Sequence, residues 1–87
     1  MATTIKVDIV SAEASIYSGI ASIVFAPAIF GDVGIKPRHA PLLAQIKPGE
    51  VRVRNEEGHE ESFYVSGGYL EVQPHIVTVL ADTALRA

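Results

Sequence analysis

The sequence predicts an all-β protein, an antiparallel β-sandwich of two sheets, and three observations support this prediction. First, Ile and Val contribute 19 of the 87 residues, against five Leu and one Met, and β-branched side chains favour strands over helices. Second, several short runs alternate apolar and polar residues, as a strand with one buried face does. Third, Gly and Pro recur at close spacing between these runs, and no long segment has the period of a helix.

Nine short strands are expected along the chain. Residues 5–9 and 50–54 alternate most clearly, with an apolar side chain at every second position. Residues 76–80 are apolar at nearly every position, so we expect this strand to lie deep in the fold. The other expected strands are residues 14–17, 20–26, 33–35, 42–46, 62–66 and 69–73.

Turn-forming residues separate these strands. A strand is expected to end at Ser18 and Gly19, and residues 55–60 are typical of a hairpin loop. Gly67 and Gly68 predict either a tight turn or a sharp bend between consecutive strands. After the last strand, residues 83–87 contain good helix formers and could form at most the start of a helix.

Length and composition limit the classes of protein that fit. A chain of 87 residues is expected to form a single domain, residues 1–87. Its net charge of −3 gives no general attraction to nucleic acid or anionic lipid. No apolar run reaches the roughly 18 to 20 residues of a membrane span, and the N-terminus lacks the pattern of a secretory signal. We therefore expect an intracellular protein without direct membrane insertion.

No catalytic, cofactor-binding or metal-binding residue is predicted. The chain has no Cys, and His39, His59 and His75 fall in three different expected loops without the local spacing of metal ligands. Ser66 lacks the first glycine of a Gly-x-Ser-x-Gly nucleophile motif. Residues 31–34 contain two glycines but no Lys followed by Ser or Thr, so they do not predict a phosphate-binding loop.

Residues 25–35 form an expected loop that is unusually apolar. Ile29 and Phe30, beside Gly31, are the side chains we expect to be exposed. An exposed apolar loop on a small acidic domain indicates a protein partner. The same pattern is equally compatible with a loop that folds back over the end of the sandwich.

Residues 31–43, with the sequence Gly-Asp-Val-Gly-Ile-Lys-Pro-Arg-His-Ala-Pro-Leu-Leu, resemble the signature stretch of the epsilon subunit of the bacterial F-type ATP synthase. The similarity continues through residues 8–13, 17–19, 46–49, 66–72 and 77–84 in the same order, and so covers almost the whole chain. It implies an N-terminal β-sandwich of two antiparallel sheets, in agreement with the independent strand prediction.

The resemblance also implies a function. Such subunits are non-catalytic parts of the central rotor stalk: they bind gamma and the c-subunit ring, and reach the catalytic head through gamma. They help to couple proton translocation to ATP synthesis, which would place this chain peripherally at the cytoplasmic face of the bacterial inner membrane, in the F1 sector. Relatives usually continue into an inhibitory helical hairpin, which is expected to be missing from these 87 residues.

Two sets of interface residues follow from the resemblance by matching positions. Asp32 is the preferred ring contact, because the ring loops of this family commonly present basic side chains. The set expected at the c ring is Phe30, Gly31, Asp32 and Val33, and the set expected near gamma and the ring is Arg38, His39, Pro41, Leu42 and Leu43.

The alternative function is a stand-alone β-sandwich that binds a ligand such as a carbohydrate, but the chain has only three Tyr, three Phe and no Trp to display on an open face. A small hydrolase is disfavoured by the absence of a nucleophile or metal motif.

Overall fold

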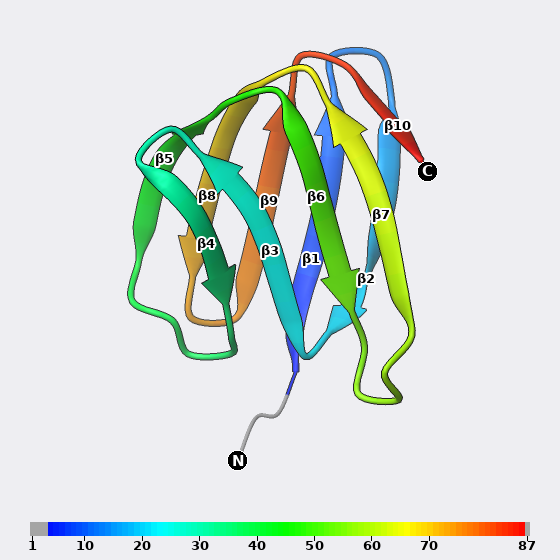
Figure 1. The fold of residues 1–87 in the computed structure, drawn as a ribbon. Coiled ribbons are helices and arrows are strands. Elements are labelled where there is room, and N and C mark those ends of the chain that lie inside the picture. Colours follow the sequence, from blue (N-terminus) through cyan, green and yellow to red (C-terminus); the bar gives the residue numbers. More distant parts are fainter. Residues whose placement is uncertain (1–3, 87) are drawn as a thin grey trace.

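Ten strands, and no helix, make up residues 4–86, the part of the chain that the computed structural model describes (Figure 1). This confirms the predicted all-β class. The strands are β1 (Ile5–Ser11), β2 (Ser15–Ala21), β3 (Ile23–Ala28), β4 (Gly31–Ile35), β5 (Leu42–Ile46), β6 (Gly49–Arg54), β7 (Glu60–Val65), β8 (Gly68–Gln73), β9 (Ile76–Ala81) and β10 (Ala84–Arg86).

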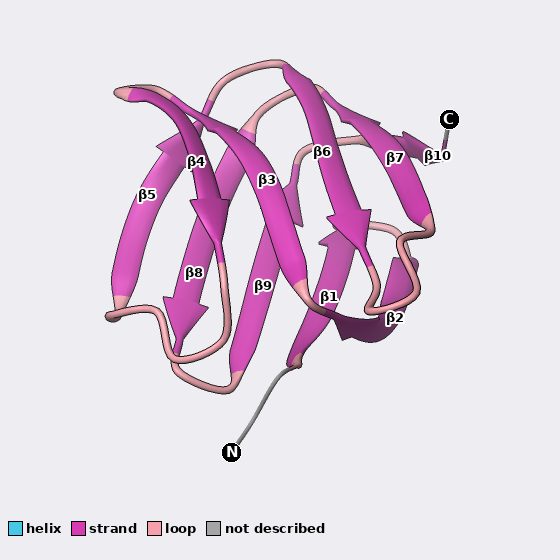
Figure 2. Cartoon of the chain, turned by 60° about the horizontal axis from the view of Figure 1, so that its bottom comes forward, coloured by secondary structure: helices cyan, strands magenta, loops and turns pink. Residues whose placement is uncertain are grey.

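The strands form two facing layers, which agrees with the predicted sandwich (Figure 2). The front sheet has the order β4-β3-β6-β7-β10, and the rear sheet has the order β5-β8-β9-β1-β2. Strand β3 belongs to the front sheet, but its last residue, Ala28, pairs with Ile46 of β5. The ladder of paired strands therefore passes from one layer to the other and gives a nearly closed, barrel-like sandwich.

Most neighbouring strands are antiparallel, as predicted, but β1 and β9 are parallel. The pair runs from Lys6 opposite Ile76 to Ser11 opposite Ala81. The local alternation of each strand is the same in a parallel and an antiparallel pair, so the sequence pattern carried no signal for this direction. The sheet is therefore mixed rather than purely antiparallel.

The core is formed by the inward-facing residues of both sheets. Ile5, Val7 and Ile9 of β1 are buried, and so are Val77 and Val79 of the adjacent β9. Successive side chains of a strand point to opposite faces, so this period of two supplies one buried row from each strand. All the buried residues are apolar, and the structure leaves no buried side-chain polar atom without a hydrogen bond in the part it describes.

The possible helix start at residues 83–87 is not formed within the described residues, because Ala84–Arg86 is strand β10. It pairs antiparallel with the edge of β7, with Leu85 opposite Tyr64. A helix of so few residues is marginal alone, whereas the edge of β7 offers backbone hydrogen-bonding partners. The side chain of Arg86 adds to this attachment, since its Nη2 lies 3.2 Å from Glu61 Oε1 and its guanidinium lies 5.4 Å from the Phe63 ring centre.

Two expected connections differ from the prediction. Gly19 lies within β2, and the chain leaves the rear sheet at Ser22 instead, where the Ser22 N–H donates to the carbonyl of Arg54 (2.8 Å). Residues 25–35 are not a loop, because β3 and β4 pair as a hairpin from Val24 opposite Ile35 to Ala28 opposite Gly31. The predicted hairpin loop is confirmed as the connection between the paired strands β6 and β7, but it ends at residue 59, because Glu60 already pairs with Arg54 as the first residue of β7.

Candidate functional site

The predicted ring contact lies at the end of the β3–β4 hairpin. Ile29 and Phe30 form the two-residue connection, and both are exposed, Phe30 at 66%. The tip is held against the rear sheet because the Ile29 N–H donates to the carbonyl of Gln45 (2.9 Å). The expected exposure of these two apolar side chains is thus confirmed, and the backbone that presents them is a paired strand end rather than a free loop.

Asp32 lies one residue beyond this tip, on β4 opposite Pro27. Its side chain is exposed and lines a groove of about 370 Å³ together with Lys47, Pro48 and Arg52. Its neighbour Val33 is half-buried and packs against the core. Asp32 is therefore the one charged residue of the predicted ring set, and it is available to a partner.

The second predicted set begins in the turn after β4. His39 donates its backbone N–H to the carbonyl of Lys36 (3.1 Å), and Arg38 donates its own to Pro74 (3.0 Å). The second bond fastens this turn to the β8–β9 connection, so the two lie side by side at the bottom of Figure 1. The imidazole Nδ1 of His39 lies 2.7 Å from the carbonyl oxygen of Ala40.

The remaining residues of that set lead into β5. Pro41 and Leu43 are exposed, Leu43 at 72%, whereas Leu42 is half-buried and packs against the core. Pro41, Leu42 and Leu43 line a shallow groove of about 260 Å³ with β8. Leu43 therefore points outward from the rear sheet, opposite Glu71.

The two predicted sets do not form one cluster. Phe30 precedes the first residue of β4, and Arg38 follows the strand's last residue, Ile35. A strand of this length separates its ends by about 3.3 Å per residue, so the tip and the turn lie at opposite ends of β4 (Figure 1). A partner that contacts both sets must extend along the molecule.

Sequence reasoning missed two apolar side chains on the outer face of the rear sheet. Tyr69 of β8 and Leu80 of β9 face each other across the strand pair, and both are about half exposed. Gln45 opposite Tyr69 connects this pair to β5 and to the hairpin tip. We call Leu43, Tyr69 and Leu80 the apolar rear face. The alternation of β8 contained the signal for Tyr69, but the expectation that residues 76–80 lie deep in the fold was wrong for Leu80.

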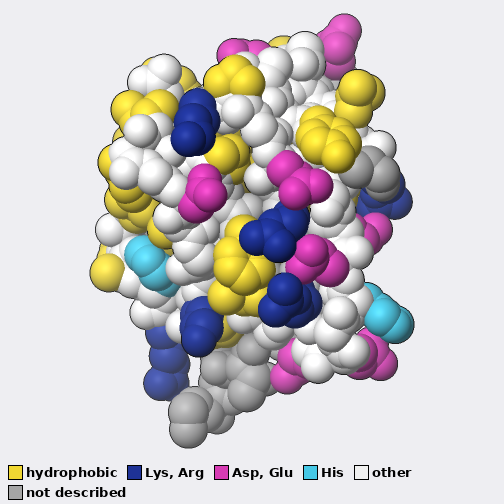
Figure 3. Space-filling model, in the orientation of Figure 1, with side chains coloured by type: hydrophobic (Ala, Val, Ile, Leu, Met, Phe, Trp, Pro, Cys, Tyr) yellow, Lys and Arg dark blue, Asp and Glu magenta, His cyan; other side chains and the backbone are white. Residues whose placement is uncertain are grey.

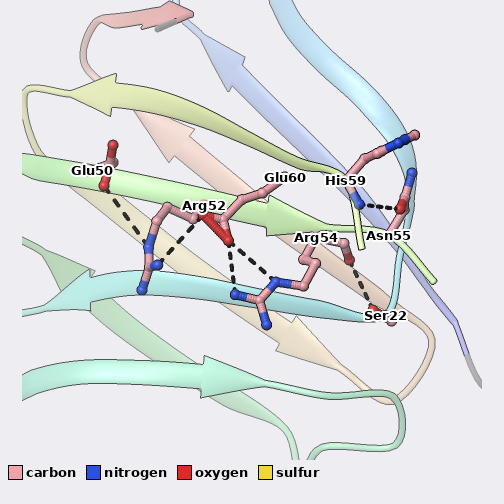
Figure 4. A network of polar contacts seen from close by, with 7 residues as sticks. All are labelled: Ser22, Glu50, Arg52, Arg54, Asn55, His59 and Glu60. Carbon is pink, nitrogen blue, oxygen red and sulfur yellow. Dashed lines mark hydrogen bonds and ion pairs between the residues drawn. The ribbon is translucent and has the colours of Figure 1, made fainter. Parts of the chain in front are cut away.

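The outer face of the front sheet has the opposite character. In Figure 3, Lys and Arg side chains alternate with acidic ones around an apolar centre. Arg54 Nη2 lies 3.0 Å from Glu60 Oε1, and Arg52 Nη1 lies 3.6 Å from Glu60 Oε2 (Figure 4). The two guanidinium groups also cover the Phe25 ring, at 4.5 and 5.5 Å from its centre. These charged side chains form ion pairs with one another, so this part of the front sheet offers few unpaired charged groups to a partner.

No group of three or more His, Asp or Glu side chains that could hold a metal ion occurs within residues 4–86. The same residues contain no helix with the length and hydropathy of a membrane span. The pKa of the Tyr17 hydroxyl is raised, first by burial and then by the negative charge of Glu61, while the positive charge of Arg86 opposes the rise.

Comparison with known proteins agrees with this architecture. Residues 4–87 match the family model described as the β-sandwich domain of the ATP synthase delta/epsilon chain. The chain is 66% identical over 87 residues to the ATP synthase epsilon chain of Nitrosococcus oceani, and 66% identical over 85 residues to that of Alkalilimnicola ehrlichii. The two matches include 100% and 98% of this chain, but only 62% and 61% of the relatives' length.

Solved structures show the same fold at low sequence identity. A chain in the cryo-EM structure of the Euglena gracilis mitochondrial ATP synthase matches with a TM-score of 0.92 and 19% identity, over 99% of this chain and 55% of that chain. A chain in the central stalk and c-ring structure from Tetrahymena thermophila matches with a TM-score of 0.75 and 15% identity, over 93% of this chain and 65% of that chain. The family match over residues 4–87 shows that this chain belongs to the ATP synthase delta/epsilon family, of which it contains the β-sandwich domain.

Proposed function

We propose that residues 1–87 act as one domain of a non-catalytic rotor subunit in the central stalk of a bacterial F-type ATP synthase. The observation that carries this proposal is the match of residues 4–87 to the family's β-sandwich domain, supported by relatives at 66% identity that are epsilon chains. In this role the domain binds gamma and the c ring, and helps to couple proton translocation to ATP synthesis. It is then a peripheral part of the F1 sector at the cytoplasmic face of the inner membrane.

The apolar rear face is the surface that we assign to gamma. Leu43, Tyr69 and Leu80 remain exposed there, while the charges of the front sheet pair with one another. The fully buried centre of a long-lived interface is more apolar than ordinary surface and is depleted of charge. The part of the rear sheet around Tyr69 and Leu80 fits that description better than the front sheet does, and Glu71 borders it opposite Leu43.

Hydrogen exchange of the 87-residue chain with and without purified gamma tests this assignment. Protection is expected on β5, β8 and β9, including residues 41–43, because a docked partner slows exchange of the strands that it covers. The β6–β7 loop with Glu56 and Glu57 serves as the internal control and should exchange equally in both samples. Protection confined to that loop, or no binding at micromolar concentrations, would contradict the proposal.

The hairpin tip is the surface that we assign to the c ring. Asp32→Lys should weaken coupling, because it would place a cation opposite the basic ring loops that the family resemblance implies, and like-charge contacts at an interface cost several kcal/mol. ATP-driven proton pumping by the reconstituted complex should fall. The melting temperature of the isolated chain should hardly change, since Asp32 is exposed and forms no hydrogen bond or ion pair with any described residue.

Glu13→Lys is the matched control, because it makes the same change of charge at an exposed position in the β1–β2 turn. Pumping by this variant should equal that of the unsubstituted protein. Equal losses in both variants would mean that net charge matters rather than the position of Asp32. A large fall in melting temperature for Asp32→Lys would mean that Asp32 is structural.

A further inference from the structure

The turn between β4 and β5 holds one residue in an unfavourable backbone conformation. The Lys36 carbonyl accepts the N–H of His39 (3.1 Å), so Pro37 and Arg38 are the central residues of a four-residue turn. Proline at the first central position and a positive φ at the second are the marks of a type II turn. Arg38 has a φ of 67°, and it is the one non-glycine residue with a positive φ in the described chain.

Glycine is the residue that this position favours. A Cβ atom at positive φ meets the backbone, so side-chain-bearing residues other than Asn and Asp are uncommon there. The Arg38 N–H donates to the carbonyl of Pro74 (3.0 Å), and this bond fixes the turn against the β8–β9 connection. The chain therefore accepts backbone strain at position 38 that a glycine would not cause.

The side chain of Arg38 does not compensate for this strain within the fold. It is exposed, and its guanidinium forms no hydrogen bond, ion pair or ring contact with any of residues 4–86. By contrast, Arg52, Arg54 and Arg86 each pair with a glutamate. Strained backbone at an exposed residue with an unused side chain is typical of a functional position rather than a structural one.

The surroundings of Arg38 are cationic although the protein as a whole is acidic. Residues 33–46 contain Lys36 and Arg38 but no carboxylate. On the neighbouring strand β8, Glu71 faces outward opposite Leu43, and on β1 the carboxylate of Asp8 lies 3.8 Å from Lys6 Nζ.

From these observations we infer that Arg38 recognises a carboxylate of the protein that docks on the apolar rear face. The turn continues directly into Pro41 and Leu43, at the edge of that face. The planar guanidinium can bind a carboxylate through two parallel hydrogen bonds, which sets orientation as well as affinity. Two or three free cations are too few for firm attachment to an anionic lipid surface, which favours an acidic protein segment.

This inference rests on the proposed binding of gamma, so the experiment distinguishes a failure of the inference about Arg38 from a failure of gamma binding itself. Gamma is titrated into the unsubstituted 87-residue chain and into Arg38→Gly at low and at high ionic strength. Arg38→Gly should bind about tenfold more weakly at low salt, and the difference should shrink as salt rises. Its melting temperature should be equal or higher, because glycine relieves the positive φ. Lys47→Ala removes one equally unpaired cation elsewhere and should change the affinity by less than about twofold.

A coupling reaction identifies the chemical class of the partner group. In a Lys36→Arg background, Arg38→Lys introduces an amine that a zero-length carbodiimide should join to a carboxylate of gamma, whereas the background alone should give much less product. Vesicles of pure phosphatidylglycerol provide the comparison with lipid and should bind the unsubstituted chain and Arg38→Gly equally.

Each outcome has one meaning. Unchanged gamma binding by Arg38→Gly overturns the inference and leaves the proposed function intact. No gamma binding by the unsubstituted chain overturns both. Loss of vesicle binding with unchanged gamma binding in Arg38→Gly assigns the guanidinium to lipid phosphate and overturns the carboxylate.

Discussion

Phe63→Ala is expected to lower the free energy of unfolding by about 3 to 5 kcal/mol, the usual cost of truncating a buried aromatic side chain. Phe63 is fully buried and is the largest side chain of the core. Its ring lies 5.2 Å from that of Tyr17 in β2 and beneath Arg86 of β10. The substitution therefore removes contacts between the front sheet, the rear sheet and the last strand together.

A loss of this size is a large share of the roughly 5 to 15 kcal/mol that stabilises a small domain. Urea denaturation followed by circular dichroism measures it, with Tyr64→Ala as the matched control. Tyr64 is the next residue of β7, but it points outward and is 55% exposed. Its truncation should cost less than about 1 kcal/mol, the range of a single cross-strand contact. Similar losses for the two variants would mean that the core is not organised around Phe63.

The all-β class could be predicted because each strand carries its own signal. The alternation of β1, with Ile5, Val7 and Ile9 buried, needs no knowledge of the rest of the chain. The same local signal predicted the β6–β7 hairpin, where Asn55 Oδ1 accepts the N–H groups of Glu57 and His59. Such side-chain bonds to a nearby backbone stabilise a turn from within.

Features that depend on distant partners could not be predicted in this way. Ala84–Arg86 has good helix formers, yet it becomes β10 because the unpaired edge of β7 is available to it. Ser22 ends β2 because its hydroxyl and its N–H both reach the carbonyl of Arg54, a residue far away in the sequence (Figure 4). Neither partner is visible in the local pattern.

The same distinction between local patterns and distant partners explains why only part of the candidate site could be predicted. Exposure of Ile29 and Phe30 followed from apolar residues beside Gly31, which is a local pattern. The positive φ of Arg38 is set by a turn that is bonded to Pro74, and Leu80 is exposed because residues 4–86 place no further layer above the rear sheet. Both are tertiary effects, so the sequence indicated the segment that contains Arg38 without showing what is unusual about it.

Gly68 is the position where we expect a single added methyl group to cause the second large loss of stability. It begins β8 just after the chain crosses from the front sheet to the rear sheet, because β7 and β8 do not pair with each other. The bend alternative for Gly67 and Gly68 is thus confirmed. Gly68 pairs with Ile46 on one side and with Ala81 on the other, and its φ is 142°.

A Cβ atom on Gly68 would collide with the backbone carbonyl oxygen of Leu80 and lie 2.9 Å from the Cα atom of Ala81. Both are backbone atoms of a central strand, so no side-chain rotation can relieve the contact. The positive φ adds strain of about 1 to 3 kcal/mol. Gly68→Ala should therefore lose more than about 3 kcal/mol of stability, or yield no folded protein.

Gly67→Ala separates the two causes of this loss. Gly67 has a similar φ of 123°, but the nearest atom to an added Cβ there is the Ile46 carbonyl oxygen at 3.5 Å, an ordinary contact. This variant should carry the strain without the collision, fold, and melt only moderately below the unsubstituted chain. Thermal melting of the two variants side by side decides between the explanations. If both lose the same stability, backbone strain alone accounts for the glycine pair. If Gly68→Ala melts like the unsubstituted chain, β8 and β9 do not approach each other as closely at Leu80 as the structure shows.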